Sequence, residues 1–287
     1  MARILSQHYE VEPAWPQSPE HTRQLTAQAV ADGYDLVAAM GGDGVVHHVA
    51  HILSGTSTVL AIIPTGTTNV YARLCGIPKK ATAAARLLTG EHRRQPTPIL
   101  RIDGIQDGTK SRRHALFAAG FGFDAEVVKA AEAEPYRKYH FGAMHYARTA
   151  IGTAIRGFRR RRSHARVTAG TRKADAVALL IQFREVYTYF GRLKLSFGAG
   201  NPTPLTTLVV ESIPARRIPR IGAALLRGAD LGKVPGLQVW EGVDSIDLEA
   251  DPPIWGQADG ELTGAWATAQ ITLIPEALEV VVPSASK

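Results

Sequence analysis

The sequence predicts an α+β protein with an α/β N-terminal domain, built on a parallel sheet, and a β-rich C-terminal domain. Up to Thr89, apolar strand-like runs alternate with stretches of helical period, which is typical of a parallel sheet covered by helices. After Pro98, short strand-like segments follow one another between turn residues. The polar segment 93–96 separates the two patterns. We therefore predict domains over residues 1–96 and 97–287, with the final segment returning to the first domain.

The first domain is expected to open with a helix whose start is clearly marked. Ser18 is placed as the N-cap, Pro19 takes the first helical position, and Glu20 supplies an acid in the first turn. The helix is expected to end near Ala31, before Gly33. The following elements alternate between strand and helix, and they are predicted at Asp35–Met40, Gly44–Leu53, Val59–Pro64, Val70–Leu74 and Thr82–Thr89.

The second domain is expected to consist of short strands bounded by turn residues. The predicted strands are ILRIDG, RHALFAAGFGF, HARVTAG, DAVALLIQF, TTLVVESI, LQVWEGV, DSIDLEA, TAQITLI and LEVVVP. Two helical stretches, near residues 143–157 and 214–227, interrupt them. This pattern predicts a domain that is mainly β-sheet.

Composition limits the classes of function that need consideration. The chain has 287 residues, a net charge of +7 and a single cysteine, Cys75, so it cannot form an intramolecular disulfide. A reducing cytoplasmic setting fits best. No apolar run is long enough to span a bilayer, and the N-terminus lacks the apolar core of a signal peptide. The positive charge favours a polyanionic partner, which could be nucleic acid, nucleotide phosphates or an anionic membrane surface, with a merely basic soluble protein as the alternative.

A strand-to-helix turn carries the first candidate phosphate loop. Directly after the apolar strand stand four residues that are poor strand formers, Gly41, Gly42, Asp43 and Gly44. Glycines let a backbone approach a ligand closely, and the helix that follows presents free N–H groups at the positive end of its dipole. The turn therefore predicts an anion site, and a tight turn capped by Asp43 is the structural alternative.

A second loop supports the phosphate interpretation. It also lies between a strand and a helix, and it comprises Thr65, Gly66, Thr67, Thr68 and Asn69. Loops after neighbouring strands of a parallel sheet meet at its carboxyl edge, where ligands bind. The P-loop and Rossmann motifs are both absent from the sequence, so the site is expected to be of another type.

These two loops carry a resemblance to a known family. The segments GGDGVVHHV and AIIPTGTTNVYAR resemble the GGDGT…PxGTxN(D/V)xAR signature of the diacylglycerol kinase catalytic family, which includes bacterial lipid kinases, sphingosine kinases and ceramide kinases. Further segments of the chain also resemble this family: Ala118–Val128, Tyr187–Ala199, Gln257–Glu261 and the closing LIPEALEVVVP. The resemblance covers nearly the whole chain.

The resemblance implies a fold and an activity. The fold is that of diacylglycerol kinases and NAD kinases, in which a β-sandwich-type domain follows the α/β nucleotide-binding domain. The activity is ATP-dependent transfer of a phosphate to the hydroxyl of diacylglycerol or a similar lipid alcohol, with ATP and Mg²⁺ as cofactors. The enzyme would act from the cytoplasm, associating transiently with the anionic inner face of the membrane. No nucleic-acid partner is expected, and the oligomeric state is left open, with a homodimer as one alternative.

The resemblance also implies roles for particular residues. The expected nucleotide-binding residues are Gly41, Gly42, Asp43, Gly44, Gly66, Thr67 and Asn69. Asp259 is the expected general base, and Glu261 would help to organise metal and nucleotide. Asp43 is the second candidate, either as the base or as an organiser of metal and phosphate. These roles suit phosphoryl transfer, which depends on positioning and charge stabilisation. The ligands of the metal itself stay unassigned.

The sequence departs from the family pattern at several points. Val45 stands where the family usually has threonine, and His48 where it often has glutamate. Asn201 lies in a loop that often carries acidic Mg²⁺ ligands, so we predict no metal site there. Residues 1–13 resemble the end of the family's first helix and its second strand, so the given sequence is expected to lack the first strand and its phosphate loop, either naturally or because its start is truncated or misassigned. Weak or altered activity would follow. An NAD kinase-like enzyme, or a non-catalytic protein that binds nucleotide or lipid, therefore remains an alternative.

Two charged clusters have simple structural interpretations. His47, His48 and His51 lie on one predicted helix, where exposed helix histidines are favoured over a metal site because no third ligand is evident. The run Arg159–Arg162 is by default a solvated loop. A lipid kinase must reach a bilayer, however, and we hypothesise that these arginines help to dock it on anionic lipid.

Overall fold

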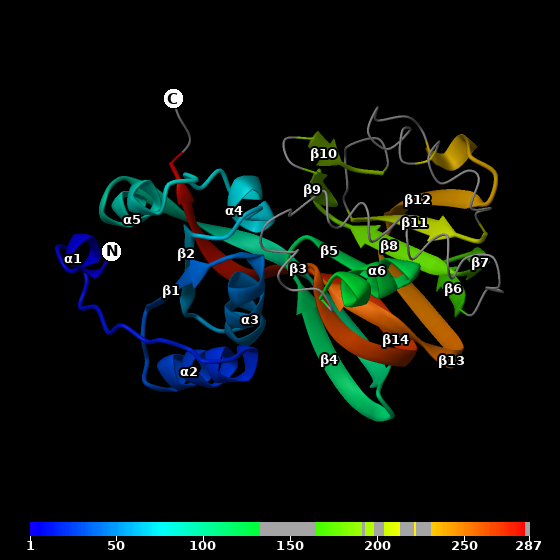
Figure 1. Cartoon of the computed structure of the whole chain (residues 1–287), viewed down its shortest axis with the longest axis horizontal. Helices are drawn as coiled ribbons and strands as arrows, with labels where there is room; N and C mark the ends of the chain where they lie inside the picture. Colours follow the sequence, from blue (N-terminus) through cyan, green and yellow to red (C-terminus); the bar gives the residue numbers. More distant parts are fainter. Residues whose placement is uncertain (133–164, 191–192, 198–203, 213–220, 222–230, 285–287) are drawn as a thin grey trace. The chain divides into compact units, whose positions relative to one another are not determined.

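The computed structural model describes residues 1–132, 165–190, 193–197, 204–212, 221 and 231–284 (Figure 1). The chain divides into two compact units: residues 1–99 with 274–287, and residues 100–273. Strand β3 (His92–Gln106) contains the boundary that the sequence suggested at residue 96, and the strand continues from the first unit into the second. The division after residue 273 likewise falls within strand β14 (Glu261–Pro283).

The first unit has the predicted alternation of helices and strands. Its elements before β3 are α1 (Ala2–Leu5), α2 (Pro19–Ala31), β1 (Leu36–Gly41), α3 (Asp43–Leu53), β2 (Val59–Pro64), α4 (Val70–Leu74) and α5 (Ala81–Thr89). The start predicted for the first long helix is confirmed, since the Ser18 hydroxyl accepts a hydrogen bond from the His21 N–H at 3.1 Å. The expected parallel pairing is also confirmed. It runs in register from Leu36 opposite Val59 to Gly41 opposite Pro64.

Strand β2 forms the centre of this unit because it is buried along its whole length. Alternate residues of a strand face opposite sides of the sheet. On one side Val59, Ala61 and Ile63 share a core with Leu88 of α5 and Val281 of β14. Strand β14 lies beside β2 in the parallel direction. The residues of β2 that face the other side are buried as well, which explains why the sequence of this strand is a continuous apolar run.

The opening residues differ from the expectation. A short helix is present at α1, but residues 6–17 contain no strand. Pro13 and Pro16 lie in this segment, and proline lacks the N–H that a sheet ladder needs. The Tyr9 hydroxyl instead donates to the Leu88 carbonyl at 2.8 Å, which attaches the segment to the end of α5. The predicted second strand is therefore wrong for this chain.

The second unit is mainly antiparallel sheet, as expected. Beyond the part of β3 that it contains, its elements are β4 (Thr109–Ala115), β5 (Ala118–Gly122), α6 (Phe123–Glu132), β6 (Ala165–Ala169), β7 (Arg172–Ala176), β8 (Ala178–Gln182), β9 (Thr188–Phe190), β10 (Leu193–Leu195), β11 (Leu205–Val210), the 3-10 helix η3 (Leu231–Lys233), β12 (Leu237–Val243) and β13 (Ser245–Ala258), followed by the start of β14. Strands β13, β5, β8, β11 and β12 are consecutive neighbours. Their core includes Trp266 and Phe121, whose rings meet edge to face.

Two features of this unit were not foreseen. Strands β13 and β14 are long, with 14 and 23 residues, where the sequence suggested short strands. Helix α6 was missed because its residues directly follow an apolar glycine-rich strand. Gly122 ends that strand with a φ of +73°, and a Cβ there would lie 2.3 Å from the Val177 carbonyl oxygen. Only glycine makes this turn without strain, and α6 begins at the next residue.

Several other expectations fall outside the described residues. These are the helical stretches near 143–157 and 214–227, the arginine run Arg159–Arg162, and Asn201. Within the described part of the chain, no helix is long and apolar enough to cross a membrane.

Candidate functional site

The two glycine loops lie directly against each other in the first unit. They begin at the paired carboxyl ends of β1 and β2, where the Thr65 N–H donates to the Gly41 carbonyl at 3.0 Å. A Cβ built on Gly66 would lie 2.6 Å from the Cα of Gly42, so the two backbones touch at a place where no side chain fits. The predicted meeting of the loops at the sheet edge is therefore present in the structure.

Asp43 joins the first loop to the helix that follows the second. Its carboxylate oxygens accept hydrogen bonds from the backbone N–H groups of Val70 and Tyr71, at 2.9 and 3.1 Å. These donors belong to the first turn of α4, where N–H groups have no acceptor within the helix. Asp43 thus caps α4 from a distant element, and this role is additional to any part that it plays in chemistry.

Asn69 shapes the second loop from within. Its side-chain NH₂ donates to the Gly66 carbonyl at 2.7 Å, and its Oδ1 accepts from the Gly66 N–H at 3.1 Å. Its own backbone is left-handed, with φ of 48°, a conformation that asparagine tolerates better than most residues. Thr65, Gly66 and Thr67 are consequently presented to solvent at the tip of the loop.

The joined loops have the chemistry of a phosphate site. Gly42 is the N-cap of α3, an 11-residue helix, and has no side chain that could cap its first turn. The N–H groups of Gly44 and Val45 lie in that turn, where the helix supplies no acceptor and its dipole favours negative charge. The exposed Thr67 hydroxyl is a further possible donor. The seven predicted nucleotide-binding residues are therefore brought together in one unit.

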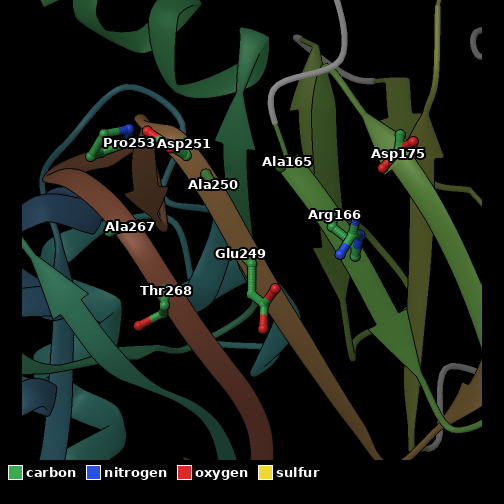
Figure 2. A pocket seen from close by; sticks show the side chains of 9 residues that line it. All are labelled: Ala165, Arg166, Asp175, Glu249, Ala250, Asp251, Pro253, Ala267 and Thr268. Carbon is green, nitrogen blue, oxygen red and sulfur yellow. The ribbon is translucent and has the colours of Figure 1, made fainter.

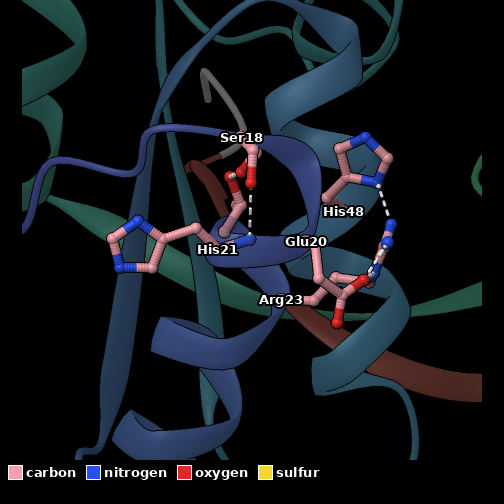
Figure 3. Close-up of polar contacts among 6 residues, drawn as sticks. Ser18, Glu20, His21, Arg23 and His48 are labelled. Carbon is pink, nitrogen blue, oxygen red and sulfur yellow. Dashed lines mark hydrogen bonds and ion pairs between the residues drawn. The ribbon is translucent and has the colours of Figure 1, made fainter.

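The unusual His48 is held by α2. The Nδ1 atom of His48 lies 3.2 Å from an Arg23 guanidinium nitrogen, and Arg23 also forms an ion pair with Glu20 (Figure 3). A guanidinium can only donate, so Nδ1 is the acceptor and the imidazole is neutral with its proton on Nε2. Burial, with smaller contributions from His47 and Arg23, lowers the pKa of His48 to about 4. His48 therefore connects two helices as a neutral hydrogen-bond acceptor.

The expectation of exposed helix histidines is wrong for His47, which is 7% exposed. It is buried in α3, and its ring meets that of His48 edge to face at 5.3 Å. No group of three or more metal-ligating side chains occurs among the residues that the structure describes.

Asp259 and Gly260 form the turn between β13 and β14 in the second unit. Ala258 pairs with Glu261 across a two-residue loop, and both loop residues have positive φ, 55° and 86°. Asp-Gly is a favoured pair for a type I′ hairpin turn, which requires these φ values. Asp259 is therefore both the first residue of a hairpin turn and the carboxylate expected to act in catalysis. Glu261 follows the turn as the first residue of β14.

The Asp259 carboxylate is held by the backbone of a neighbouring segment. It accepts hydrogen bonds from the N–H groups of Leu116, Phe117 and Ala118, at 2.7, 3.0 and 3.3 Å. The Asp259 N–H in turn donates to the Ala118 carbonyl. The side chain is almost wholly buried, at 6% exposure. The sequence identified this carboxylate as a candidate but did not indicate its structural role. Its hydrogen bonds fasten the turn to the start of β5.

A polar cluster beside this turn was missed. Asp124, Tyr187 and Gln257 are mutually hydrogen-bonded in the second unit. Burial raises the pKa of the Asp124 carboxyl, although its bonds to Tyr187 and Gln257 act in the opposite direction. Burial and the neighbouring Asp124 raise the pKa of the Tyr187 hydroxyl well above its ordinary value. Each residue lies in a family-like segment, but nothing in the sequence indicates that the three meet.

A surface groove of about 660 Å³ lies elsewhere in the second unit (Figure 2). A cross-strand row crosses it, in which Arg166 of β6 stands opposite Glu249 of β13 on one side and Asp175 of β7 on the other. Opposite charges in this arrangement stabilise a sheet surface. None of the residues lining the groove belongs to the predicted site, and the row has a sufficient structural explanation.

Comparison with known proteins identifies the family of the part that carries the loops. Residues 1–99 match the family model described as the diacylglycerol kinase catalytic domain. Residues 1–99 are therefore similar to the catalytic domain of diacylglycerol kinases. The match includes both glycine loops and Asp43, so the family expected from the sequence motifs is confirmed.

Similarity to diacylglycerol kinases extends beyond that domain. A diacylglycerol kinase of Mycobacterium tuberculosis strain H37Rv is 29% identical over 264 residues, covering 91% of this chain and 81% of the relative. A probable lipid kinase YegS-like of Stenotrophomonas maltophilia strain K279a is 32% identical over 134 residues, covering 45% of this chain and 41% of the relative.

Solved structures support the fold. A crystal structure of a putative diacylglycerol kinase from Bacillus anthracis strain Sterne matches with a TM-score of 0.69 and 22% identity, covering 94% of this chain and 83% of that one. The combination of an α/β N-terminal domain with a sheet-rich C-terminal domain is therefore confirmed as a diacylglycerol kinase-like fold.

Proposed function

We propose that this chain is an ATP-dependent lipid kinase, transferring the γ-phosphate of ATP to the hydroxyl of diacylglycerol or a similar lipid alcohol. The observation that carries the proposal is the backbone contact between Gly42 and Gly66, which holds two glycine loops together at paired strand ends, with Asp43 tying the first loop to α4. The similarity to diacylglycerol kinases over most of the chain supports the same class of reaction.

The loops would bind the nucleotide through its phosphates. The first-turn N–H groups of α3 and the Thr67 hydroxyl suit phosphate oxygens, and a loop glycine carries no side chain that would hold a ligand away from the backbone. When bound, Mg·ATP supplies the phosphoryl group and the metal charge that stabilises its transfer. Mg²⁺ usually arrives on substrate phosphates with one or two protein carboxylates, and Asp43 and Glu261 are the candidates.

A carboxylate would receive the proton of the lipid alcohol. We propose Asp259 as this base and Asp43 as the second candidate. As the acceptor oxygen bonds to the γ-phosphorus, the bond from that phosphorus to the bridging oxygen of ADP breaks, and the hydroxyl proton passes to the carboxylate. The hydrogen bonds that hold Asp259 would keep its position constant during this transfer.

Transient binding to an anionic membrane surface is part of the proposal. The acceptor resides in a bilayer, and the net charge of +7 favours anionic lipid. The arginines at 159–162 are proposed as the contact. Replacing all four with serine should weaken binding to phosphatidylglycerol-containing vesicles, and unchanged vesicle binding would exclude this contact.

A transfer assay tests the function directly. Radiolabelled ATP and Mg²⁺ are incubated with the full chain and a panel of diacylglycerol, ceramide, sphingosine and NAD. The expected result is a labelled lipid extractable into organic solvent, with none from NAD. Label on NAD alone would favour an NAD kinase. ATP binding without transfer to any acceptor would favour a non-catalytic protein, and either result would overturn the proposal.

A further inference from the structure

A network of three side chains joins elements that are far apart in the sequence of the second unit. Asp124 comes from the first turn of α6, Tyr187 directly precedes β9, and Gln257 lies near the end of β13. The Tyr187 hydroxyl donates to Asp124 Oδ2 at 2.6 Å, and Gln257 Nε2 donates to the same oxygen at 2.7 Å. The Gln257 Nε2 also lies 2.9 Å from the Tyr187 hydroxyl.

The network ends on the Asp-Gly turn. The other end of the Gln257 amide, Oε1, accepts a hydrogen bond from the Gly260 N–H at 2.8 Å. The Gly260 N–H can only donate, so it requires the oxygen end of the amide. Asp124 Oδ2 already accepts a hydrogen bond from Tyr187, so it requires the NH₂ end of the Gln257 amide as its second donor. The chemistry at both ends therefore permits one orientation of Gln257, and Asp124 with Tyr187 selects it.

The surrounding backbone is fitted to this network. Gly120 of β5 pairs with Gln257 of β13. A Cβ on Gly120 would lie 1.9 Å from Asp124 Oδ2 and 2.9 Å from Gln257 Nε2. Any other residue at position 120 would displace both side chains. Gln257 itself is 4% exposed, so its amide has little access to water as an alternative partner.

These residues also come from family-like segments of the second unit, two of which have no other role in the proposed chemistry. The family-like segments Ala118–Val128, Tyr187–Ala199 and Gln257–Glu261 each supply one member of the network. The last of these segments also contains Asp259 and Glu261, two of the three carboxylates proposed for chemistry. The N–H group that the network binds belongs to the peptide bond between Asp259 and Gly260.

We propose that Asp124, Tyr187 and Gln257 are positioning residues that set the orientation of the turn carrying Asp259 and Glu261. The proposal rests on the proposed function, because the turn matters for turnover only if its carboxylates act in the transfer. The side chain of Asp259 is fastened independently by the backbone at 116–118. The network therefore controls the peptide at Gly260 and, through it, the direction in which Glu261 leaves the turn.

Each member of the network can be tested with a substitution that removes one defined group. Tyr187→Phe removes the hydroxyl while keeping the ring, whose centre lies 5.1 Å from that of Phe197. Gln257→Leu removes the acceptor of the Gly260 N–H. Asp124→Leu removes the shared acceptor, whereas Asp124→Asn keeps one oxygen for both donors. Gln238→Leu is the matched control, since Gln238 also bridges two side chains in this unit, Glu211 and Trp240.

Two readouts test the proposal in the full chain. The first is hydrogen exchange of the Gly260 amide. We expect it to accelerate at least about tenfold in Tyr187→Phe and Gln257→Leu, since each variant weakens a bond in a nearly dry environment. The second is lipid kinase turnover. We expect kcat to fall about tenfold in those variants with little change in the KM for ATP, because the loops of the first unit are untouched. Asp124→Asn should keep both properties and Asp124→Leu should lose both.

Each outcome decides a separate question. Unchanged Gly260 exchange in both variants would overturn the positioning role whatever the activity. Faster exchange with full kcat would show a structural network only, which would also overturn it. Equal losses in Asp124→Asn and Asp124→Leu, or in Gln238→Leu and Gln257→Leu, would mean general destabilisation and would count against the proposal. If the unaltered protein transfers phosphate to no lipid, the proposed function fails, and the exchange of Gly260 alone decides whether the network orients the turn.

Discussion

The carboxylate of Asp43 accepts a hydrogen bond from the backbone N–H of Val70 at 2.9 Å. This bond ties the first turn of α3 to the first turn of α4, so the two glycine loops are held as one unit. Recognition of phosphate by backbone groups requires such rigidity, because N–H groups gain little affinity if they must be ordered on binding. Substitutions at this connection between the two loops should therefore affect both stability and ATP binding.

Asp43→Asn should destabilise the fold as well as weaken ATP binding. Both oxygens of Asp43 accept from backbone donors, so an asparagine must direct its NH₂ at one of them. An unmatched donor pair costs about 1–3 kcal/mol of unfolding free energy. Urea unfolding and calorimetric titration with ATP measure the two effects. The exposed Asp35→Asn is the control and should change stability by less than about 0.5 kcal/mol. Equal stability of both variants would contradict the role of the Asp43 hydrogen bonds in holding the two loops together.

Gly66→Ala and Gly42→Ala should differ although the two glycines face each other. A Cβ on Gly66 would lie 2.6 Å from the Gly42 backbone, whereas one on Gly42 would lie at an ordinary 3.5 Å from Gly66. Gly66→Ala must separate the loops and should lose about 1–3 kcal/mol of stability, as overpacking does. Gly42→Ala should change stability by less than about 1 kcal/mol. Thermal unfolding of both variants side by side is the measurement, and a larger loss in Gly42→Ala would refute the packing argument.

Asp259→Asn should abolish transfer but also weaken the fold. Three backbone N–H groups donate to the carboxylate, using both of its oxygens, so the amide of asparagine would oppose at least one donor. We expect a stability loss of about 1–3 kcal/mol. Activity must therefore be measured well below the melting temperature of the variant, with circular dichroism confirming that it is folded. Full activity in the folded variant would remove Asp259 as the base and leave Asp43 as the candidate.

His48 should make stability depend on pH in the acidic range. Its pKa is lowered from 6.5 to about 4 in the folded protein, so the unfolded chain binds more protons between these values. Unfolding free energy should therefore rise as pH increases through this window, and its contribution from His48 should be lost as pH falls through it. His48→Gln keeps an acceptor for Arg23 but does not titrate. Urea unfolding across the window should show a smaller slope in the variant, and parallel curves would show that His48 is not responsible.

Local sequence patterns determined most of the first unit. The Ser18–Pro19–Glu20 start, the apolar run of β2 and the helical periods near Val70 and Ala84 each reflect interactions within a few residues. The loops at residues 41–44 and 65–69 were recognisable for the same reason, since glycine directly after an apolar run marks a turn or a close approach of the backbone. The strand predicted near the start of the chain is absent from residues 6–17. That prediction depended on a resemblance, and the prolines in this segment disfavour a strand.

Long-range contacts decided what the site residues do. The sequence indicated Asp43 and Asp259 as candidates but not that each carboxylate is held by backbone N–H groups, of Val70 and Leu116 respectively. It gave no sign that Asp124 and Tyr187 meet Gln257 beneath the Asp-Gly turn. A motif records which residues stand together along the chain. A buried hydrogen bond between positions more than 60 residues apart is set by the packing of strands. The sequence by itself therefore determined the elements and the phosphate loops. Only the tertiary structure decided which carboxylates are held, and by what, because their partners lie on other strands and helices.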